Sequence, residues 1–90
     1  MKEKLRFERT CSACPEQYDV YFDGFGYPML VGYVRLRWGH LTAEYKDCGK
    51  LMVYNFQFYD KMKGCFSNKK QRKKHLKRIA DALRYEMRKN

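Results

Sequence analysis

The stretch YVRLRWGHLTAEY, residues 33–45, carries the sharpest strand signal of this chain. Apolar and polar residues alternate on both sides of Gly39-His40, which is the pattern of two half-buried strands joined by a tight turn. Glycine suits the first position of a type II′ turn, so a two-residue turn at Gly39-His40 is predicted. The predicted pairs on the apolar face are Val34 with Tyr45, Leu36 with Ala43 and Trp38 with Leu41; those on the polar face are Arg35 with Glu44 and Arg37 with Thr42.

Further strands flank this hairpin. Leu5 and Phe7 alternate with charged residues, and Tyr18, Val20 and Phe22 continue the same alternation, so two short strands are expected before the hairpin. The stretch KLMVYNFQFY, residues 50–59, follows a turn and predicts one more strand, apolar on both faces.

The end of the chain, SNKKQRKKHLKRIADALRYEMRKN (residues 67–90), predicts a helix over about residues 67–89. Ser67 is a suitable N-cap. Apolar residues recur at spacings of three and four, namely Leu76, Ile79, Ala80, Leu83 and Met87, and this stripe would lie across the sheet. The predicted fold is therefore α+β: one domain over residues 1–90, with an antiparallel sheet of four or five strands (within residues 4–59) packed against one C-terminal helix.

The positive charge is concentrated in this helix. The chain carries a net charge of +10, and residues 67–90 contribute ten basic residues against two acidic ones. Following the apolar stripe backwards from Leu76 leads to Lys73, Arg72 and Lys69, so the first two turns are expected to bury nothing. Cations at a helix N-terminus oppose the macrodipole, and like charges four residues apart repel one another. Local rules broken in this way indicate a functional site.

The sequence therefore predicts a small nucleic-acid-binding module without catalytic activity, which contacts the phosphates of DNA or RNA through its basic helix. The predicted contacts are Lys69, Lys70, Arg72, Lys73, Lys74, Lys77 and Arg78, with Arg35 and Arg37 of the hairpin as candidates for base contact. A solvated, solubilising face is the alternative reading of such a lysine run.

The cysteines leave two readings open. Cys11 and Cys14 have the CxxC spacing of half a zinc site, and Cys48 and Cys65 would complete a structural zinc site. The alternative is reduced thiols without a ligand, because the chain has no export segment at its start and is expected to be cytoplasmic. No apolar run is long enough for a membrane helix, so no membrane contact is expected.

Other residue types predict no further chemistry. His40 and His75 have no sequence partners for catalysis and are expected at the surface. The aromatic run YNFQFYD, residues 54–60, could stack on single-stranded bases, but aromatic residues at strand spacing are usually core.

The segments RTCSACPEQYDVY and VGYVRLRWGHLTAEYKDCG resemble stretches of a group of small proteins from bacteria and their phages. The likeness implies a phage or mobile-element setting in a bacterial host, and it transfers no functional residue. In that setting the alternative function is an anti-CRISPR-like, anti-defence viral protein that binds a host nucleic-acid-processing or defence protein. Both functions use complementary charge.

Overall fold

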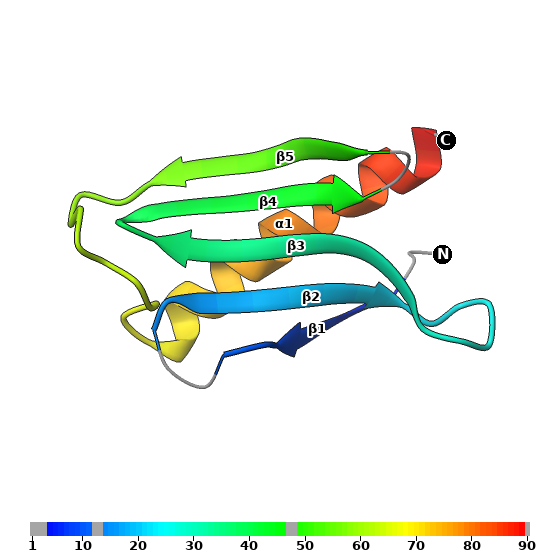
Figure 1. The fold of residues 1–90 in the computed structure, drawn as a ribbon, viewed down its shortest axis with the longest axis horizontal. Helices are drawn as coiled ribbons and strands as arrows, with labels where there is room; N and C mark the ends of the chain where they lie inside the picture. Colours follow the sequence, from blue (N-terminus) through cyan, green and yellow to red (C-terminus); the bar gives the residue numbers. More distant parts are fainter. Residues whose placement is uncertain (1–3, 12–13, 47–48, 90) are drawn as a thin grey trace.

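The computed structural model of the chain describes residues 4–11, 14–46 and 49–89. The elements in chain order are β1 (Leu5–Arg9), β2 (Glu16–Phe22), β3 (Met29–Arg37), β4 (His40–Lys46), β5 (Lys50–Gln57) and α1 (Lys69–Lys89). The strands form one antiparallel sheet in the order β1-β2-β3-β4-β5, and the helix crosses one face of it diagonally (Figure 1). The predicted α+β class is confirmed.

The β3–β4 hairpin forms where the sequence predicts it, but its turn lies one residue earlier. Trp38 and Gly39 are the turn residues, with φ of 56° and 72°, and a type I′ turn needs positive φ at both positions. Leu36 therefore pairs with Leu41, and Val34 pairs with Ala43. The predicted type II′ turn and its pairing are wrong, although the apolar residues of both strands keep their inward face because the partners shift by two residues.

The loop after β5 fixes this hairpin tip. The amide of Gly39 donates a hydrogen bond to the carbonyl of Lys63 at 2.7 Å, and its carbonyl accepts one from the amide of Phe58 at 2.7 Å. A Cβ on Gly39 would lie 2.4 Å from the carbonyl oxygen of Asp60, so both the positive φ and the close loop require glycine. Trp38, predicted to face the core, is instead 61% exposed.

The core lies between the sheet and the helix. Its fully buried side chains are Val20, Leu36, Leu41, Ala43, Ile79 and Leu83. Burying each of the larger ones stabilises the fold by about 1.5–3 kcal/mol. The helix approaches β3 closely at Gly32, where a Cβ would lie 3.0 Å from Cδ2 of Leu83. Sheet and helix thus share one core, which fixes the position of the basic helix.

The diagonal course of the helix leaves parts of the inner sheet face less covered (Figure 1). On the edge strand β5, Tyr54 and Phe56 pair with Ala43 and Leu41 and share their inward face. Phe56 nevertheless keeps 37% of its surface exposed. Among the described residues, no helix has both the length and the apolar character needed to cross a bilayer.

Candidate nucleic-acid interface on the basic helix

The helix is capped one residue later than predicted. The Asn68 side chain accepts a hydrogen bond from the amide of Gln71 at 2.8 Å, and the Gln71 side chain accepts one from the amide of Ser67 at 2.8 Å. This reciprocal arrangement resembles a capping box. Asn68 therefore takes the N-cap role predicted for Ser67, whose hydroxyl instead accepts a hydrogen bond from the Lys63 ammonium.

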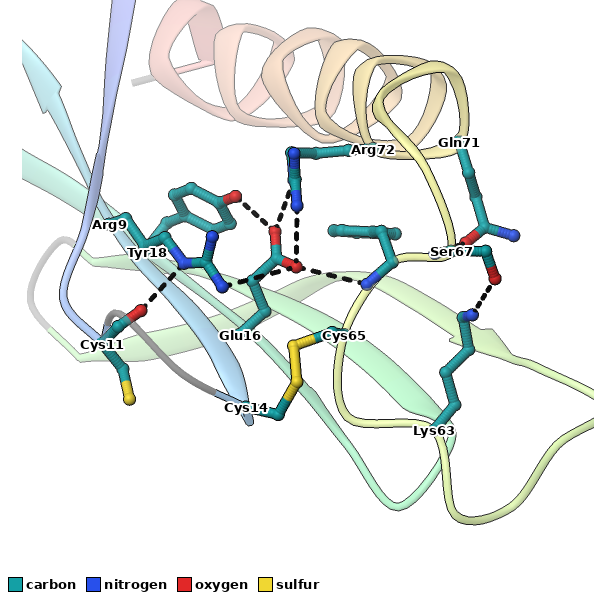
Figure 2. The surroundings of a disulfide bond; sticks show 11 residues. Arg9, Cys11, Cys14, Glu16, Tyr18, Lys63, Cys65, Ser67, Gln71 and Arg72 are labelled. Carbon is teal, nitrogen blue, oxygen red and sulfur yellow. Dashed lines mark hydrogen bonds and ion pairs between the residues drawn. A yellow bond between two sulfur atoms is a disulfide. The ribbon is translucent and has the colours of Figure 1, made fainter.

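Arg72, predicted to bind phosphate, is bound inside the fold to a carboxylate. Its Nε lies 2.7 Å from Oε2 of Glu16 and its Nη2 lies 3.3 Å from Oε1, so the contact is bidentate (Figure 2). The Glu16 side chain is fully buried at the start of β2, whereas Arg72 is 30% exposed. A guanidinium in a forked contact with a buried carboxylate is a fold contact. Arg72 is therefore held within the fold, and its contact with nucleic acid stays a prediction.

Further donors surround the same carboxylate. The Tyr18 hydroxyl donates to Oε2 of Glu16, the amide of Phe66 donates to Oε1 at 3.2 Å, and Arg9 Nη2 lies 3.8 Å from Oε1 (Figure 2). These groups come from β1, β2, the loop before the helix and the helix itself. We call Glu16, Tyr18, Phe66 and Arg72 the Glu16 anchor. The anchor ties the start of the basic helix to the sheet.

The electrostatics of the anchor favour the ionised carboxylate. Burial by itself raises the pKa of Glu16, but the hydrogen bonds from Arg72, Tyr18 and the Phe66 amide outweigh it, and the pKa lies below the ordinary 4.5. Burial and the hydrogen bond to Glu16 raise the pKa of Tyr18 to about 12. Glu16 is thus charged and Tyr18 neutral near pH 7.

His75, expected at the surface, is 3% exposed. Its Nδ1 lies 2.9 Å from the Tyr54 hydroxyl, and its ring lies 4.7 Å from that of Phe56, 5.2 Å from that of Phe58 and 5.8 Å from that of Phe66. Burial, with the nearby charges of Arg78 and Lys74, lowers its pKa. A neutral histidine therefore fills the inward face of the second turn.

These two residues correct the expectation that the first two turns bury nothing. Arg72 and His75 occupy the inward positions, and each finds polar or aromatic partners on the sheet. The predicted binding residues that do face solvent are Lys69, Lys70, Lys73, Lys74, Lys77 and Arg78. Within the described ranges, none of these six forms an ion pair with an acidic side chain.

Arg35 and Arg37 lie exposed on the sheet face opposite the helix. Arg35 opposes Thr42 and not Glu44, because of the shifted turn. A concavity of about 440 Å³ around Arg35 is also lined by Asp19 and Glu44. These acidic neighbours lower the positive potential around Arg35.

Two grooves flank the helix on its sheet side. The β5–α1 groove, about 450 Å³, is lined on the strand side by Phe56, Phe58 and Tyr59 and on the helix side by Lys70, Lys74 and His75. The β1–α1 groove has a volume of about 550 Å³. Its floor is aliphatic and aromatic, and cations form its rim. The floor residues are Leu5, Phe7, Leu76 and Ala80, and the rim residues include Lys69 and Lys73. The exposed lysines of the helix thus border both grooves.

The cysteine predictions are corrected by a disulfide. Cys14 and Cys65 are bonded to each other, with Cα atoms 5.5 Å apart, next to the Glu16 anchor (Figure 2). A disulfide sulfur is not a thiolate ligand, so the predicted four-cysteine zinc set is incompatible with this bond. Cys11 is a free, partly exposed thiol, and Cys48 lies outside the described residues. Among the described residues, no group of three or more His, Cys, Asp and Glu side chains could hold a metal.

Sequence reasoning missed Glu16 and assigned His75 to the surface. Glu16 has a detectable signal, because it shares the inward alternation of Tyr18 and Val20 and so places an acid on the buried face of β2. A buried carboxylate is stable only when a cation pairs with it, and the helix contains basic residues that could form this pair. His75 follows Arg72 by three residues and precedes Ile79 by four, so helical spacing already placed it on the buried stripe.

Comparisons with protein-family models, with curated proteins and with solved structures each gave no match. The resemblance of the first half of the chain to small bacterial and phage proteins therefore stays a prediction.

Proposed function

We propose that this protein binds DNA or RNA through the phosphate backbone, without catalysis, using the exposed face of α1. The supporting observation is that six helix cations face solvent and, within the described part of the chain, none pairs with an acidic side chain. Unpaired cations lower their free energy by contacting a polyanion, because condensed counterions are released from the nucleic acid.

The six cations form two rows along the helix. Lys69, Lys73 and Lys77 make one row, and Lys70, Lys74 and Arg78 make the other. Successive members of a row are about 6 Å apart along the axis, since each residue rises about 1.5 Å. Rows of this kind present positive charge continuously to the phosphate backbone of a nucleic acid. Arg35 and Arg37, the candidates for base contact, lie on the opposite face of the sheet. The proposed binding therefore depends mainly on contacts between the helix and phosphates.

The proposal is tested by affinity as a function of salt. Labelled single-stranded and duplex oligonucleotides are titrated by fluorescence anisotropy at several salt concentrations. Six phosphate contacts predict that log Kobs falls with log salt, with a slope of about −5 on duplex DNA and about −4 on single strands. The absence of binding at about 50 mM salt would contradict the proposal, since electrostatic binding is strongest at low salt.

Charge reversal separates binding from stability. Lys70→Glu, Lys73→Glu and Lys74→Glu together are expected to abolish binding, while the free energy of unfolding stays equal or rises by about 0.5–1.5 kcal/mol because repulsion at the helix start is relieved. The matched control is reversal of Lys4, Lys46 and Lys50, which changes the net charge equally at exposed sites outside the helix. Equal loss of binding in both triple variants would mean that net charge, and not the helix face, drives association.

A second candidate is binding to an acidic segment of a host defence protein. The β1–α1 groove favours it, because an apolar floor with a rim of lysines complements an acidic amphipathic peptide. The probe is a labelled peptide of alternating leucine and glutamate. Leu76→Gln should weaken its binding and leave oligonucleotide affinity unchanged; equal peptide affinity for the variant and the wild type would count against this candidate.

A further inference from the structure

We infer that the β5–α1 groove binds unpaired nucleobases, so that the preferred ligand is a single-stranded nucleic acid. This inference rests on the proposed function, and it adds a binding site and a ligand class to it. A single strand exposes the faces of its bases, whereas a duplex hides them in its stack.

The strand side of the groove offers the aromatic surface. Tyr59, just after β5, is fully exposed at 103%, and Phe56 keeps 37% of its surface exposed although its ring packs against that of His75 at 4.7 Å. Burying such side chains would stabilise the fold, so their exposure leaves apolar π-faces free for a ligand.

The helix side of the groove offers the charge. Lys70 and Lys74 are exposed and stand one turn apart at its rim, and none of the described residues that line the groove is acidic. Aromatic platforms beside a line of cations are the combination that binds single strands, with bases stacked and phosphates neutralised.

Two other concavities among the described residues lack part of this combination. The β1–α1 groove has cations, but apart from Phe7 its floor is aliphatic. The concavity on the outer sheet face is lined by Asp19 and Glu44 as well as by Arg35 and Lys50, so its acidic side chains offset its cations. The volume of the β5–α1 groove, about 450 Å³, lies in the range of small-ligand sites. Stacking is therefore assigned to the β5–α1 groove.

The test compares three ligands on the full chain: an oligothymidylate of about 12 nucleotides, an abasic oligomer of the same length and charge, and the corresponding duplex. The oligothymidylate is expected to bind at least about five-fold more tightly than the abasic oligomer, since one stacked base contributes about 1 kcal/mol or more. Equal affinity for these two single strands would overturn the inference.

Variants at the exposed tyrosine provide the second readout. Tyr59→Ala should weaken oligothymidylate binding about five-fold or more and leave abasic binding unchanged, and Tyr59→Phe should retain the wild-type affinity because the ring is kept. The matched control is Tyr85→Ala, an exposed tyrosine farther along α1 that does not line the groove. Wild-type affinity in Tyr59→Ala would contradict the inference.

The outcomes separate this inference from the proposed function. If all three ligands bind equally with a steep salt dependence, phosphate binding by the helix stands and base stacking in the groove is refuted. If none of the ligands binds, both fall.

Discussion

Replacement of Arg72 by methionine tests the Glu16 anchor. Methionine keeps much of the length of the side chain but removes both hydrogen bonds to the carboxylate, at 2.7 and 3.3 Å. Removing one partner of a buried ion pair typically costs about 3–5 kcal/mol. Tyr18 and the Phe66 amide still donate to Glu16, and Arg72 is itself 30% exposed. We therefore expect a loss of about 2–4 kcal/mol from the free energy of unfolding.

The reciprocal variant should cost less. Glu16→Gln leaves Arg72 without its anion, but a side chain that is 30% exposed can turn toward water. In Arg72→Met, the Glu16 carboxylate that remains cannot turn toward water, because its side chain is fully buried. We expect about 1–2 kcal/mol for Glu16→Gln and a coupling energy of about 1–3 kcal/mol in the double-mutant cycle.

The assay is urea unfolding followed by circular dichroism of the helix. A domain of this length has a free energy of unfolding of about 5–13 kcal/mol, so both variants should stay folded. Arg78→Met is the matched control on an exposed helix cation and should change stability by less than about 0.5 kcal/mol. An Arg72→Met variant as stable as wild type, or less destabilised than Glu16→Gln, would show that Arg72 does not neutralise Glu16 in the folded chain.

The pH dependence of the same measurement has a defined sign. The pKa of Glu16 is lowered by folding, so its contribution is complete above about pH 4.5 and is lost as the pH falls through the folded pKa. Glu16→Gln should flatten the acid limb of the stability curve below pH 4.5. An acid limb as steep as that of the wild type would place the titrating group elsewhere.

Three further variants test other parts of the fold. Burial lowers the pKa of His75, so below about pH 6.5 the unfolded chain takes up a proton before the folded chain does, and the wild type should lose up to about 1.4 kcal/mol of stability per pH unit. His75→Phe should remove this loss; urea midpoints between about pH 7.5 and 5.5 measure it, and an unchanged slope would contradict the prediction. Gly39→Ala should cost about 2 kcal/mol or more and exceed Gly26→Ala, which has a similar positive φ but no atom within 4 Å of its Cβ; equal costs in urea unfolding would show that the loop contact is unimportant. Replacing Cys14 and Cys65 by serine should cost about 2–4 kcal/mol, because the bond closes a loop with a sequence separation of 51; native thiol labelling that reaches both cysteines would mean that the bond is absent.

The sheet was largely predictable, because strand alternation is a local signal. The alternation of apolar and polar residues places Leu36 and Leu41 on the inward face of the sheet, and this holds for either position of the turn. The turn itself was mispredicted because its position depends on a loop more than fifteen residues away. The carbonyl of Lys63 binds the Gly39 amide and fixes the tip, and a turn with Trp38 at positive φ is not what local propensity favours.

The helix was predictable in extent but not in the roles of its cations. A lysine or arginine run looks uniform in sequence, and only the tertiary fold separates Arg72, which meets Glu16 across 56 residues, from Arg78, which faces solvent. The inward position of Glu16 on β2 was visible, but the sequence does not give the partner that neutralises it. The same holds for Cys14 and Cys65, whose pairing depends on the path of the loop before α1.

The fold separates Arg72, which binds Glu16, from the exposed helix cations, and the salt dependence of oligonucleotide binding measures this difference. For wild type we predict a log-log slope of about −5 on duplex DNA and about −4 on single strands, reduced in magnitude by about 1 in Arg78→Met and unchanged in folded Arg72→Met. Absence of binding at low salt, or a slope that changes with Arg72 and not with Arg78, would contradict it.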